Sequence, residues 1–334
     1  MKEYNGKINV SKDTMLFVVN DILNQGMKES TTKENILKMM PEIYANVDDE
    51  EIIKMLPYRT YEDLERLIEY VKTSDDIKSF FYKREHPDIR FLEDAMIIVM
   101  RAKYHDYNYT LNPGVIEKLK RLFSEENRKI AKRYEQIEKL TVGMLYTYGM
   151  VDFKFLRKQL CKYMNEIITK KELNDIYFTR LNLNTFVKDY TIEWTNTNEI
   201  QYFITYLDEE YSPIDIGQIA QEQKARNMQY KEFNKQEILK RQEYVWDKKT
   251  QELYDFIKSK NSNIYKWKFK ELIKNNELGI QVLGDLSNMC VFEDDFEVEK
   301  LMQLFINWYN NSPQYMLGGY TPNEFRIHLE NSSN

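Results

Sequence analysis

The sequence predicts a mainly α-helical protein with several subdomains, one of which is a winged-helix-like module containing a β-hairpin. Two observations lead to this fold class. Apolar residues recur at helical spacing along most of the 334 residues, and glycine (10) and proline (7) are both scarce. So few turn-forming residues favour long helices with few sharp reversals. Only residues 185–206 depart clearly from the helical pattern.

Residues 1–127 are predicted to form an N-terminal helical domain. Ser11 is a suitable N-cap for a first helix, in which apolar residues recur every three or four positions. A second helical pattern covers residues 32–44, where Pro41 is expected to kink or split the helix. A short helix pair is expected around residues 48–72.

Two further segments complete this predicted domain. Residues 91–104 are strongly apolar, and we expect them to continue the helical pattern at the centre of a core. Pro113 is suited to the first position of a helix, because its fixed φ fits the first turn. We expect that helix to run through a basic stretch towards Leu140.

The second predicted domain, residues 128–210, is the winged-helix-like module. Three helical segments come first: residues 135–148, 152–164 and 169–182. Two segments rich in β-branched and aromatic residues follow, 185–194 and 199–206, and a polar Thr-Asn-Thr-Asn sequence separates them. Such a pair predicts a β-hairpin. Three helices followed by a hairpin is the order of elements in a winged-helix module.

The third predicted domain, residues 211–334, is helical and ends in a dense set of turn signals. Two aromatic residues, a double glycine and a helix cap follow one another: Trp308 and Tyr309, Gly318 and Gly319, and Thr321 with Glu324. The double glycine is expected to reverse the chain at positive φ, and the cap to start a last short helix. We expect this segment to pack onto the preceding helices as a structural element.

Charge is segregated along the chain. Residues 128–183 carry 12 Lys and Arg against 6 Asp and Glu, and residues 224–274 carry 14 against 7. By contrast, residues 184–223 carry 1 against 8, and residues 275–334 carry 2 against 9. One interpretation is that these blocks neutralise each other across intramolecular interfaces. The other is that the basic blocks form a patch for the phosphate backbone of nucleic acid.

On the second interpretation, the candidate nucleic-acid-binding residues are cations of the two basic blocks. They are Lys154, Arg157, Lys158, Lys162, Lys170, Lys171, Lys266, Lys268 and Lys270. The first six are expected to face outward. The last three alternate with aromatic residues, which is typical either of nucleic-acid contacts or of core aromatics flanked by lysines that reach solvent.

No catalytic residue, cofactor or metal site is predicted. His86, His105 and His328 are isolated from one another and from Cys161 and Cys290, so no zinc-ligand spacing occurs. Two distant cysteines favour reduced thiols, and no apolar segment has the length of a signal peptide or membrane span. We therefore expect a cytoplasmic, non-enzymatic protein that needs no metal and does not associate with membranes.

Four segments, taken in order, resemble a family of largely helical, poorly characterised proteins of low-GC Gram-positive bacteria. Many members of that family end in a SecA-type (SEC-C) zinc-binding tail. The segment around Leu56-Pro57-Tyr58 resembles their Rho-N/SAP-like helix pair, and residues 144–151 resemble their winged-helix-like middle. Residues 230–239 resemble a linker helix, and residues 310–324 resemble the segment before the tail. The cysteine-rich tail itself is absent here, so the resemblance implies no zinc.

These observations favour a protein that acts by binding. The leading hypothesis is a non-catalytic, nucleic-acid-associated regulatory or adaptor protein of a bacterium or its phage. The alternative is a protein-interaction factor without direct nucleic-acid contact, such as a chaperone-like protein or a phage-encoded inhibitor of a host complex. An enzyme with an unrecognised site is a third class. Salt-dependent nucleic-acid binding separates the first two, since phosphate contacts release counterions.

Overall fold

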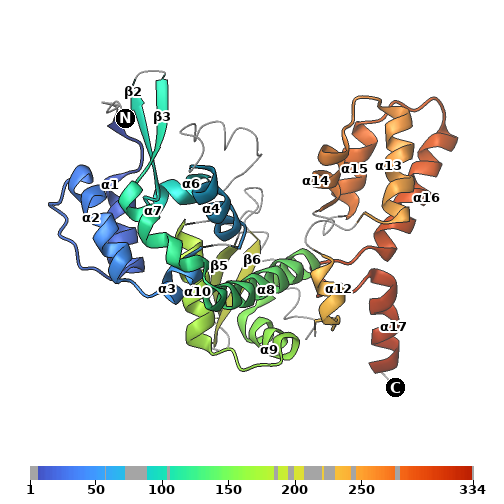
Figure 1. Ribbon diagram of the computed structural model, residues 1–334. Coiled ribbons are helices and arrows are strands. Elements are labelled where there is room, and N and C mark those ends of the chain that lie inside the picture. The colour runs from blue at the N-terminus through green and yellow to red at the C-terminus, as the bar shows by residue number, and fades with distance from the viewer. Residues whose placement is uncertain are drawn as a thin grey trace. The chain divides into compact units, whose positions relative to one another are not determined.

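The computed structural model describes residues 7–56, 58–71, 89–103, 106–183, 187–194, 199–206, 220–221, 230–241, 246–274 and 279–332. This part of the chain is mainly helical, as predicted, and includes two antiparallel sheets of three strands each (Figure 1). The chain divides into two compact units: residues 1–138 with 167–187, and residues 139–166 with 188–334.

The first unit contains β1 (Lys7–Ile8), α1 (Lys12–Phe17), the π-helical turn η1 (Val18–Ile22), α2 (Lys33–Asn46), α3 (Asp49–Met55), α4 (Tyr58–Tyr70), α6 (Ile89–Asp94), β2 (Ile98–Lys103), β3 (Asp106–Leu111), α7 (Pro113–Leu119), the 3₁₀ turn η2 (Lys120–Phe123), the first part of α8 (Glu125–Tyr148) and α10 (Lys170–Leu183). Its first helices begin where the sequence predicts. The Ser11 hydroxyl accepts a hydrogen bond from the Thr14 amide at 3.0 Å, as an N-cap does. Helix α2 is continuous, so Pro41 does not split it.

Residues 91–94 are helical, in α6, but residues 98–103 form strand β2, so the prediction of a helix over residues 91–104 was wrong for this second part. Helix α6 ends because Met96 adopts a left-handed conformation with φ of 56°, and its amide bonds back to the Glu93 carbonyl at 2.8 Å. The β-branched residues 97–99 then favour an extended chain. The resulting strand β2 pairs antiparallel with both β1 and β3.

The single helix expected between Pro113 and Leu140 is three elements, α7, η2 and α8. Ser124 interrupts it with an extended backbone, φ −65° and ψ 157°. The Ser124 hydroxyl accepts a hydrogen bond from the Asn127 amide at 3.3 Å, so this serine caps the new helix α8. The apolar periodicity alone predicts one continuous helix, but the capping residue Ser124 divides it into separate helices.

One arginine holds several elements of the first unit together. Arg121 donates from Nη2 to the carbonyls of Tyr44 at 3.0 Å and Val47 at 2.6 Å. It also donates from Nη1 to the Ala45 carbonyl at 3.2 Å and from Nε to the Asp49 carboxylate. The guanidinium therefore satisfies carbonyl groups at the C-terminal end of α2, which have no partner within the helix.

The second unit contains the rest of α8, β4 (Met150–Asp152), α9 (Phe153–Met164), nearly all of β5 (Val187–Trp194), β6 (Glu199–Tyr206), α12 (Lys235–Leu239), α13 (Lys248–Lys260), α14 (Lys266–Lys274), α15 (Gly279–Asn288), α16 (Asp295–Asn311) and α17 (Pro322–Ser332). The two predicted strands are present as β5 and β6. Strand β4, which the sequence did not reveal, pairs antiparallel with β6, and the strand order is β4–β6–β5. Because α10 belongs to the first unit, the winged-helix arrangement stays a prediction.

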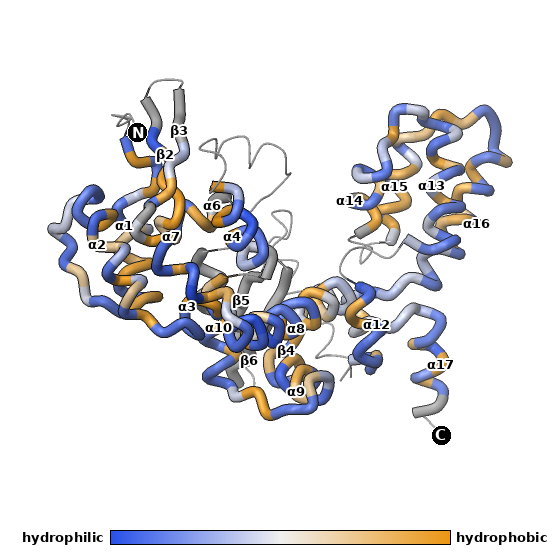
Figure 2. Tube along the Cα trace, viewed as in Figure 1, coloured by the Kyte–Doolittle hydropathy of each residue, from blue (hydrophilic) through white to orange (hydrophobic). Residues whose placement is uncertain are grey.

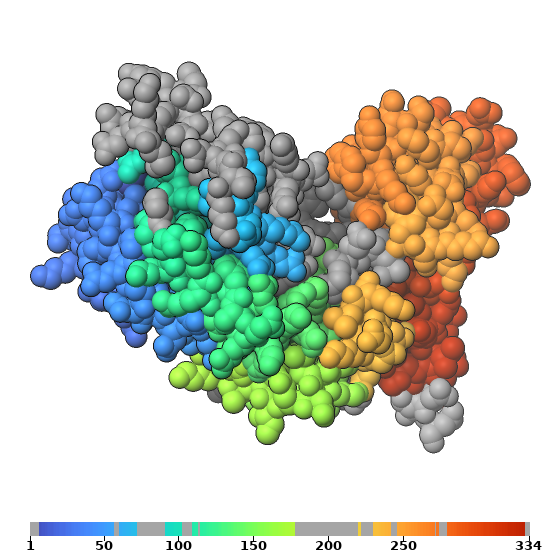
Figure 3. Space-filling view, in the orientation of Figure 1, coloured from blue at the N-terminus to red at the C-terminus, as the bar shows by residue number. Residues whose placement is uncertain are grey.

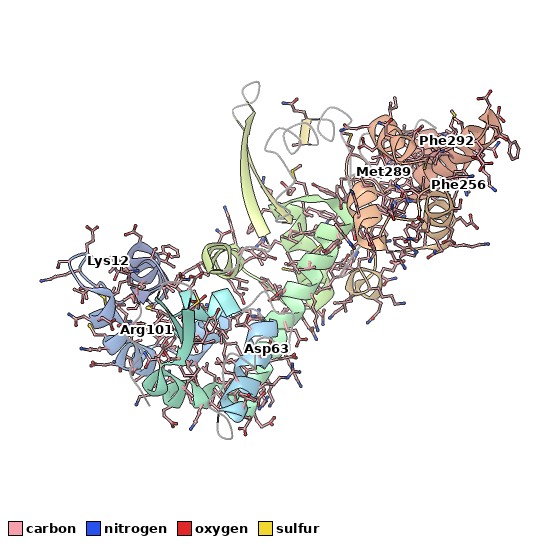
Figure 4. All side chains as sticks on the ribbon, turned by 90° about the horizontal axis from the view of Figure 1, so that it is seen from above. Lys12, Asp63, Arg101, Phe256, Met289 and Phe292 are labelled. Carbon is pink, nitrogen blue, oxygen red and sulfur yellow. The ribbon has the colours of Figure 1, made fainter. Side chains whose placement is uncertain are left out.

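Helices α13 to α16 enclose a core of their own. Each of these helices contributes apolar residues to it, and hydrophobic segments alternate with hydrophilic ones along their traces (Figure 2). Trp308 is fully buried in this core with Leu253 and Phe269. Phe256 belongs to the same core, against which the partly buried Met289 and Phe292 pack (Figure 4).

The C-terminal segment folds as predicted. Gly318 and Gly319 have φ values of 57° and 86°, in the left-handed region that residues with a Cβ avoid. The Thr321 hydroxyl accepts from the Glu324 amide at 3.2 Å, and the Glu324 carboxylate accepts from the Thr321 amide at 3.0 Å. These reciprocal bonds form a capping box that starts α17. Tyr315 and Trp308 are buried, as predicted for a segment that packs onto the preceding helices.

The extended residues 230–234 lie between the end of α8 and this C-terminal segment. The Tyr148 hydroxyl donates to the Lys231 carbonyl at 2.6 Å, and the Lys231 amide donates to the Gly318 carbonyl at 2.9 Å. The Tyr163 hydroxyl donates to the Phe233 carbonyl at 2.7 Å. In Figure 3 the segment that includes α12 lies against the red C-terminal residues. This region is therefore held by specific hydrogen bonds as well as by apolar contact.

Candidate nucleic-acid interface

Helix α9 is amphipathic and well capped. The Asp152 carboxylate accepts from the Phe155 amide at 2.9 Å at its start, and Asn165 ends it in the left-handed conformation. Leu156 and Leu160 are fully buried on its inner face. Apolar residues at this spacing fix the rotation of the helix, and so decide which residues face solvent.

The outer face of α9 is basic. Its exposed residues are Lys154, Arg157, Lys158 and Lys162, whose spacing places them along one side of a helix. They are exposed, as predicted. Lys162 lies 2.7 Å from the Glu232 carboxylate, and this hydrogen bond lowers the pKa of Glu232. Both side chains of that pair are exposed, so it contributes little to stability.

The remaining cations of this face, Lys154, Arg157 and Lys158, form no salt bridge with any other residue that the structure describes. Lys158 does, however, help to lower the pKa of Glu232, so part of its charge already acts on that carboxylate. We call these three residues with Lys162 the α9 basic face.

Lys170 and Lys171 are also exposed, in the first turn of α10. That turn is capped by Thr169, whose hydroxyl accepts from the Glu172 amide at 3.1 Å. Glu172 in turn lies 2.6 Å from Arg133 of α8. These two lysines belong to the first unit, whereas the α9 basic face belongs to the second.

The aromatic residues at the start of α14 divide between core and surface. Phe269 is fully buried, whereas Tyr265 is 63% and Trp267 is 61% exposed. The sequence alone left open whether this alternation marks core aromatics or a binding surface. The structure shows that both occur within five residues, and the exposure of Trp267 is the feature that sequence analysis missed.

The three candidate lysines of α14 surround these aromatics. Lys266 and Lys268 are exposed, and Lys270 is partly buried. The ammonium groups of Lys266 and Lys270 lie 4.1 and 6.0 Å from the ring centroid of Trp246. Such cation–π contacts orient a lysine without neutralising its charge.

Helices α15 and α16 carry an apolar groove of about 650 Å³. Its lining residues are Gly279, Ile280, Gln281, Leu283, Phe305, Ile306 and Tyr309. Ile280 is 91% and Ile306 is 51% exposed, although both belong to helices whose opposite faces are buried. This groove could not be predicted from the sequence, because a single apolar residue outside the periodic pattern is common on protein surfaces.

A smaller, polar pocket of about 290 Å³ lies in the first unit and is lined in part by Tyr61, Glu65 and Arg128. Arg128 donates from Nη1 to Glu65 Oε2 at 2.9 Å and from Nη2 to Glu65 Oε1. This bidentate hydrogen bond lowers the pKa of Glu65. Two of the three cations that line the pocket, Arg66 and Arg128, are already paired with carboxylates. Glu62, Glu65 and Glu135 line it as well, so the pocket is a poorer anion site than the α9 basic face.

Among the residues that the structure describes, no three or more His, Cys, Asp or Glu side chains are grouped as metal ligands would be. His328 stacks on Tyr320 with ring centroids 5.3 Å apart, whereas His86 and His105 lie outside the described residues. Cys161 and Cys290 are half-buried thiols, and burial raises the pKa of Cys290. Metal independence stays a prediction.

Comparison with known proteins finds no match to a protein-family model, to a curated protein or to a solved structure. Within the described ranges, no helix has both the length and the apolar character needed to cross a membrane.

Proposed function

We propose that this protein is a non-catalytic, nucleic-acid-associated regulatory or adaptor protein. The observation that carries the proposal is the α9 basic face, in which every exposed side chain is a cation. Duplex and single-stranded nucleic acids present closely spaced phosphates, and binding to them is driven largely by the release of condensed counterions. A helix with one buried apolar face and one cationic face is suited to that surface.

The order of elements supports the same proposal. Chain order is α8, β4, α9, α10, β5 and β6, and β4 pairs with β6 at the edge of a three-stranded sheet. A winged-helix domain has this connectivity. In helix-turn-helix proteins the helix before the recognition helix crosses the DNA backbone. Here α9, with its basic outer face, would take that role.

The test is a charge reversal in the α9 basic face, Arg157→Glu with Lys158→Glu. Binding to labelled duplex and single-stranded oligonucleotides is measured by fluorescence anisotropy over a range of salt concentrations. We expect weaker binding to every sequence, and a log–log salt slope that is smaller by about 2, because two phosphate contacts are lost.

A matched control reverses two exposed lysines outside the proposed interface, Lys38→Glu with Lys118→Glu. It changes the net charge by the same amount. If both double variants bind as the parent does, or lose affinity equally, the α9 basic face has no specific role and the proposal fails.

The second candidate function is that of a protein-interaction factor, and the apolar groove of α15 and α16 favours it. Residues 279–311 carry 6 Asp and Glu against 1 Lys. An apolar groove on such an acidic pair of helices fits one kind of partner, an amphipathic helix with a basic polar face.

Calorimetry with a synthetic amphipathic peptide of leucine and lysine tests this candidate. Ile306→Asp should weaken binding, because it places a carboxylate in the apolar groove. Ile327→Asp, at an exposed isoleucine of α17, is the matched control. Equal binding by both variants would show that the groove is not the docking site.

A further inference from the structure

We propose that the exposed aromatic edge of α14, formed by Tyr265 and Trp267 with Lys266 and Lys268, binds single-stranded nucleic acid by stacking on its unpaired bases. This inference rests on the proposed function and names a second, distinct contact with a particular class of nucleic acid. The α9 basic face recognises phosphates, which every nucleic acid has. The α14 edge adds recognition of base faces.

Both aromatic rings at the start of α14 are exposed to solvent. Tyr265 is 63% and Trp267 is 61% exposed, whereas Trp308 in the same bundle is fully buried. The bundle core is therefore filled by other residues and does not require these two rings. Burying a large aromatic ring on folding is favourable, so two exposed aromatic rings only two positions apart in the sequence are unusual.

Helix geometry sets the direction of Trp267. Phe269, two residues further on, is fully buried in the bundle core. Positions two apart on an α-helix point to nearly opposite sides, so Trp267 is directed away from the core. Lys266 and Lys268 lie about 100° to either side of it around the helix axis. The indole thus stands between two cations. Tyr265, which precedes the first turn and whose ring centroid lies 5.9 Å from the Lys258 ammonium, is a separate stacking platform.

Two contacts hold this edge in place. The Lys266 ammonium lies 4.1 Å from the ring centroid of Trp246, whose Nε1 donates to Gln251 Oε1 at 2.6 Å. Lys258 donates to the carbonyls of Ser262 and Ile264 at 2.7 and 2.9 Å, which fixes the turn just before Tyr265. The Lys266 side chain and the turn before Tyr265 are therefore held before a ligand binds, and such preorganisation reduces the entropy lost on binding.

The chemistry selects unpaired bases. In a duplex the faces of the bases are stacked on one another and cannot reach a side chain, whereas an unpaired base presents a free π face. Proteins that bind single strands combine aromatic platforms with cations that contact the backbone. Residues 246–274 carry 8 Lys against 4 Asp and Glu, so the cations are present as well.

The experiment compares the full-length parent with Trp267→Ala, Tyr265→Ala and Trp267→Phe. Anisotropy is measured with oligothymidylate, oligouridylate and a mixed-sequence duplex, each of about 15 nucleotides per strand. We expect each alanine variant to bind the single strands about 5- to 100-fold more weakly, the usual range for loss of one stacking side chain. Duplex binding should not change, and Trp267→Phe should largely restore single-strand binding because it retains a ring.

Phe296→Ala is the matched control, since Phe296 is a 70% exposed aromatic on the acidic helix α16 of the same bundle. It should bind as the parent does. Loss of affinity for oligouridylate alone would assign the site to RNA, and equal losses would assign it to single strands of either kind. Alanine variants that bind single strands like the parent, while Arg157→Glu with Lys158→Glu loses binding, would overturn this inference and leave the proposed function standing. A parent that binds none of the three probes would overturn both.

Discussion

The Tyr315 ring packs directly against the backbone of Gly149, so no side chain can be accommodated at residue 149 without a shift. Gly149 ends α8 at a φ of 69°, and the Tyr315 ring occupies the space into which a Cβ at Gly149 would project. The turn at Gly318 and Gly319 packs just as closely on α8, because a Cβ at Gly319 would stand 2.8 Å from the Tyr148 ring. Two glycines far apart in sequence therefore let the end of α8 and the C-terminal segment meet at van der Waals distance.

Gly149→Ala should accordingly destabilise the protein. The substitution combines an unfavourable left-handed conformation, which costs about 1–2 kcal/mol, with a steric clash that forces the Tyr315 ring to move. We expect a loss of at least about 2 kcal/mol in the free energy of unfolding, measured by urea denaturation. Gly26→Ala is the control, because Gly26 has a similar φ of 62° but no atom within 4 Å of the added Cβ. If the two variants lose the same stability, steric contact with Tyr315 plays no part.

Trp308→Ala should be among the most damaging single changes in the bundle of α13 to α16. Trp308 is fully buried in that core, and truncating such a ring typically costs about 3–5 kcal/mol. The melting temperature of the Trp308→Ala variant should therefore fall sharply. Trp267→Ala should change the free energy of unfolding by less than about 0.5 kcal/mol, because surface substitutions rarely do more. A Trp308→Ala variant as stable as the parent would contradict the structural interpretation of the C-terminal segment.

Arg121→Lys should destabilise the first unit although it retains the charge. A lysine ammonium has the reach for one carbonyl but cannot reproduce the planar set of bonds that Arg121 makes to Tyr44, Val47 and Asp49. We expect a loss of about 1–3 kcal/mol, the cost of leaving such acceptors without a donor. Lys120→Ala, at an exposed neighbour, should have little effect in the same urea titration.

The Glu65–Arg128 pair should make stability fall at acidic pH. The hydrogen bond from Arg128 lowers the pKa of Glu65 below its ordinary value of 4.5 in the folded state. A carboxyl whose pKa is lower when folded contributes stability above about pH 4.5, and that contribution is lost as pH falls through the folded pKa.

Glu65→Gln should therefore lower the midpoint of thermal unfolding at neutral pH and flatten its decline below pH 4.5. Glu126→Gln, at an exposed carboxylate of the same unit, controls for the loss of one negative charge. An unchanged acid profile in Glu65→Gln would show that this pair is not linked to folding.

Much of the fold was predictable because its determinants are local. Apolar spacing and caps such as Ser11 and Thr321 predict helices from a few neighbouring residues. The strand pair β5–β6 follows from β-branched and aromatic content, and the reversal at Gly318 from freedom at positive φ. The exposed cations of α9 were predictable for the same reason, since the periodicity of the helix fixes its outer face.

Other features depended on partners distant in sequence, and only the tertiary structure decided them. Met96 turns the chain into β2 because β1 and β3 supply strands on either side. Strand β4 exists because β6, some fifty residues later, offers it a ladder of hydrogen bonds. Which aromatic ring of α14 is buried was decided by the core of α13 to α16, which takes Phe269 and leaves Trp267 in solvent. Sequence periodicity determines the faces of each element, but the element packed against a face determines whether that face becomes core, interface or exposed surface.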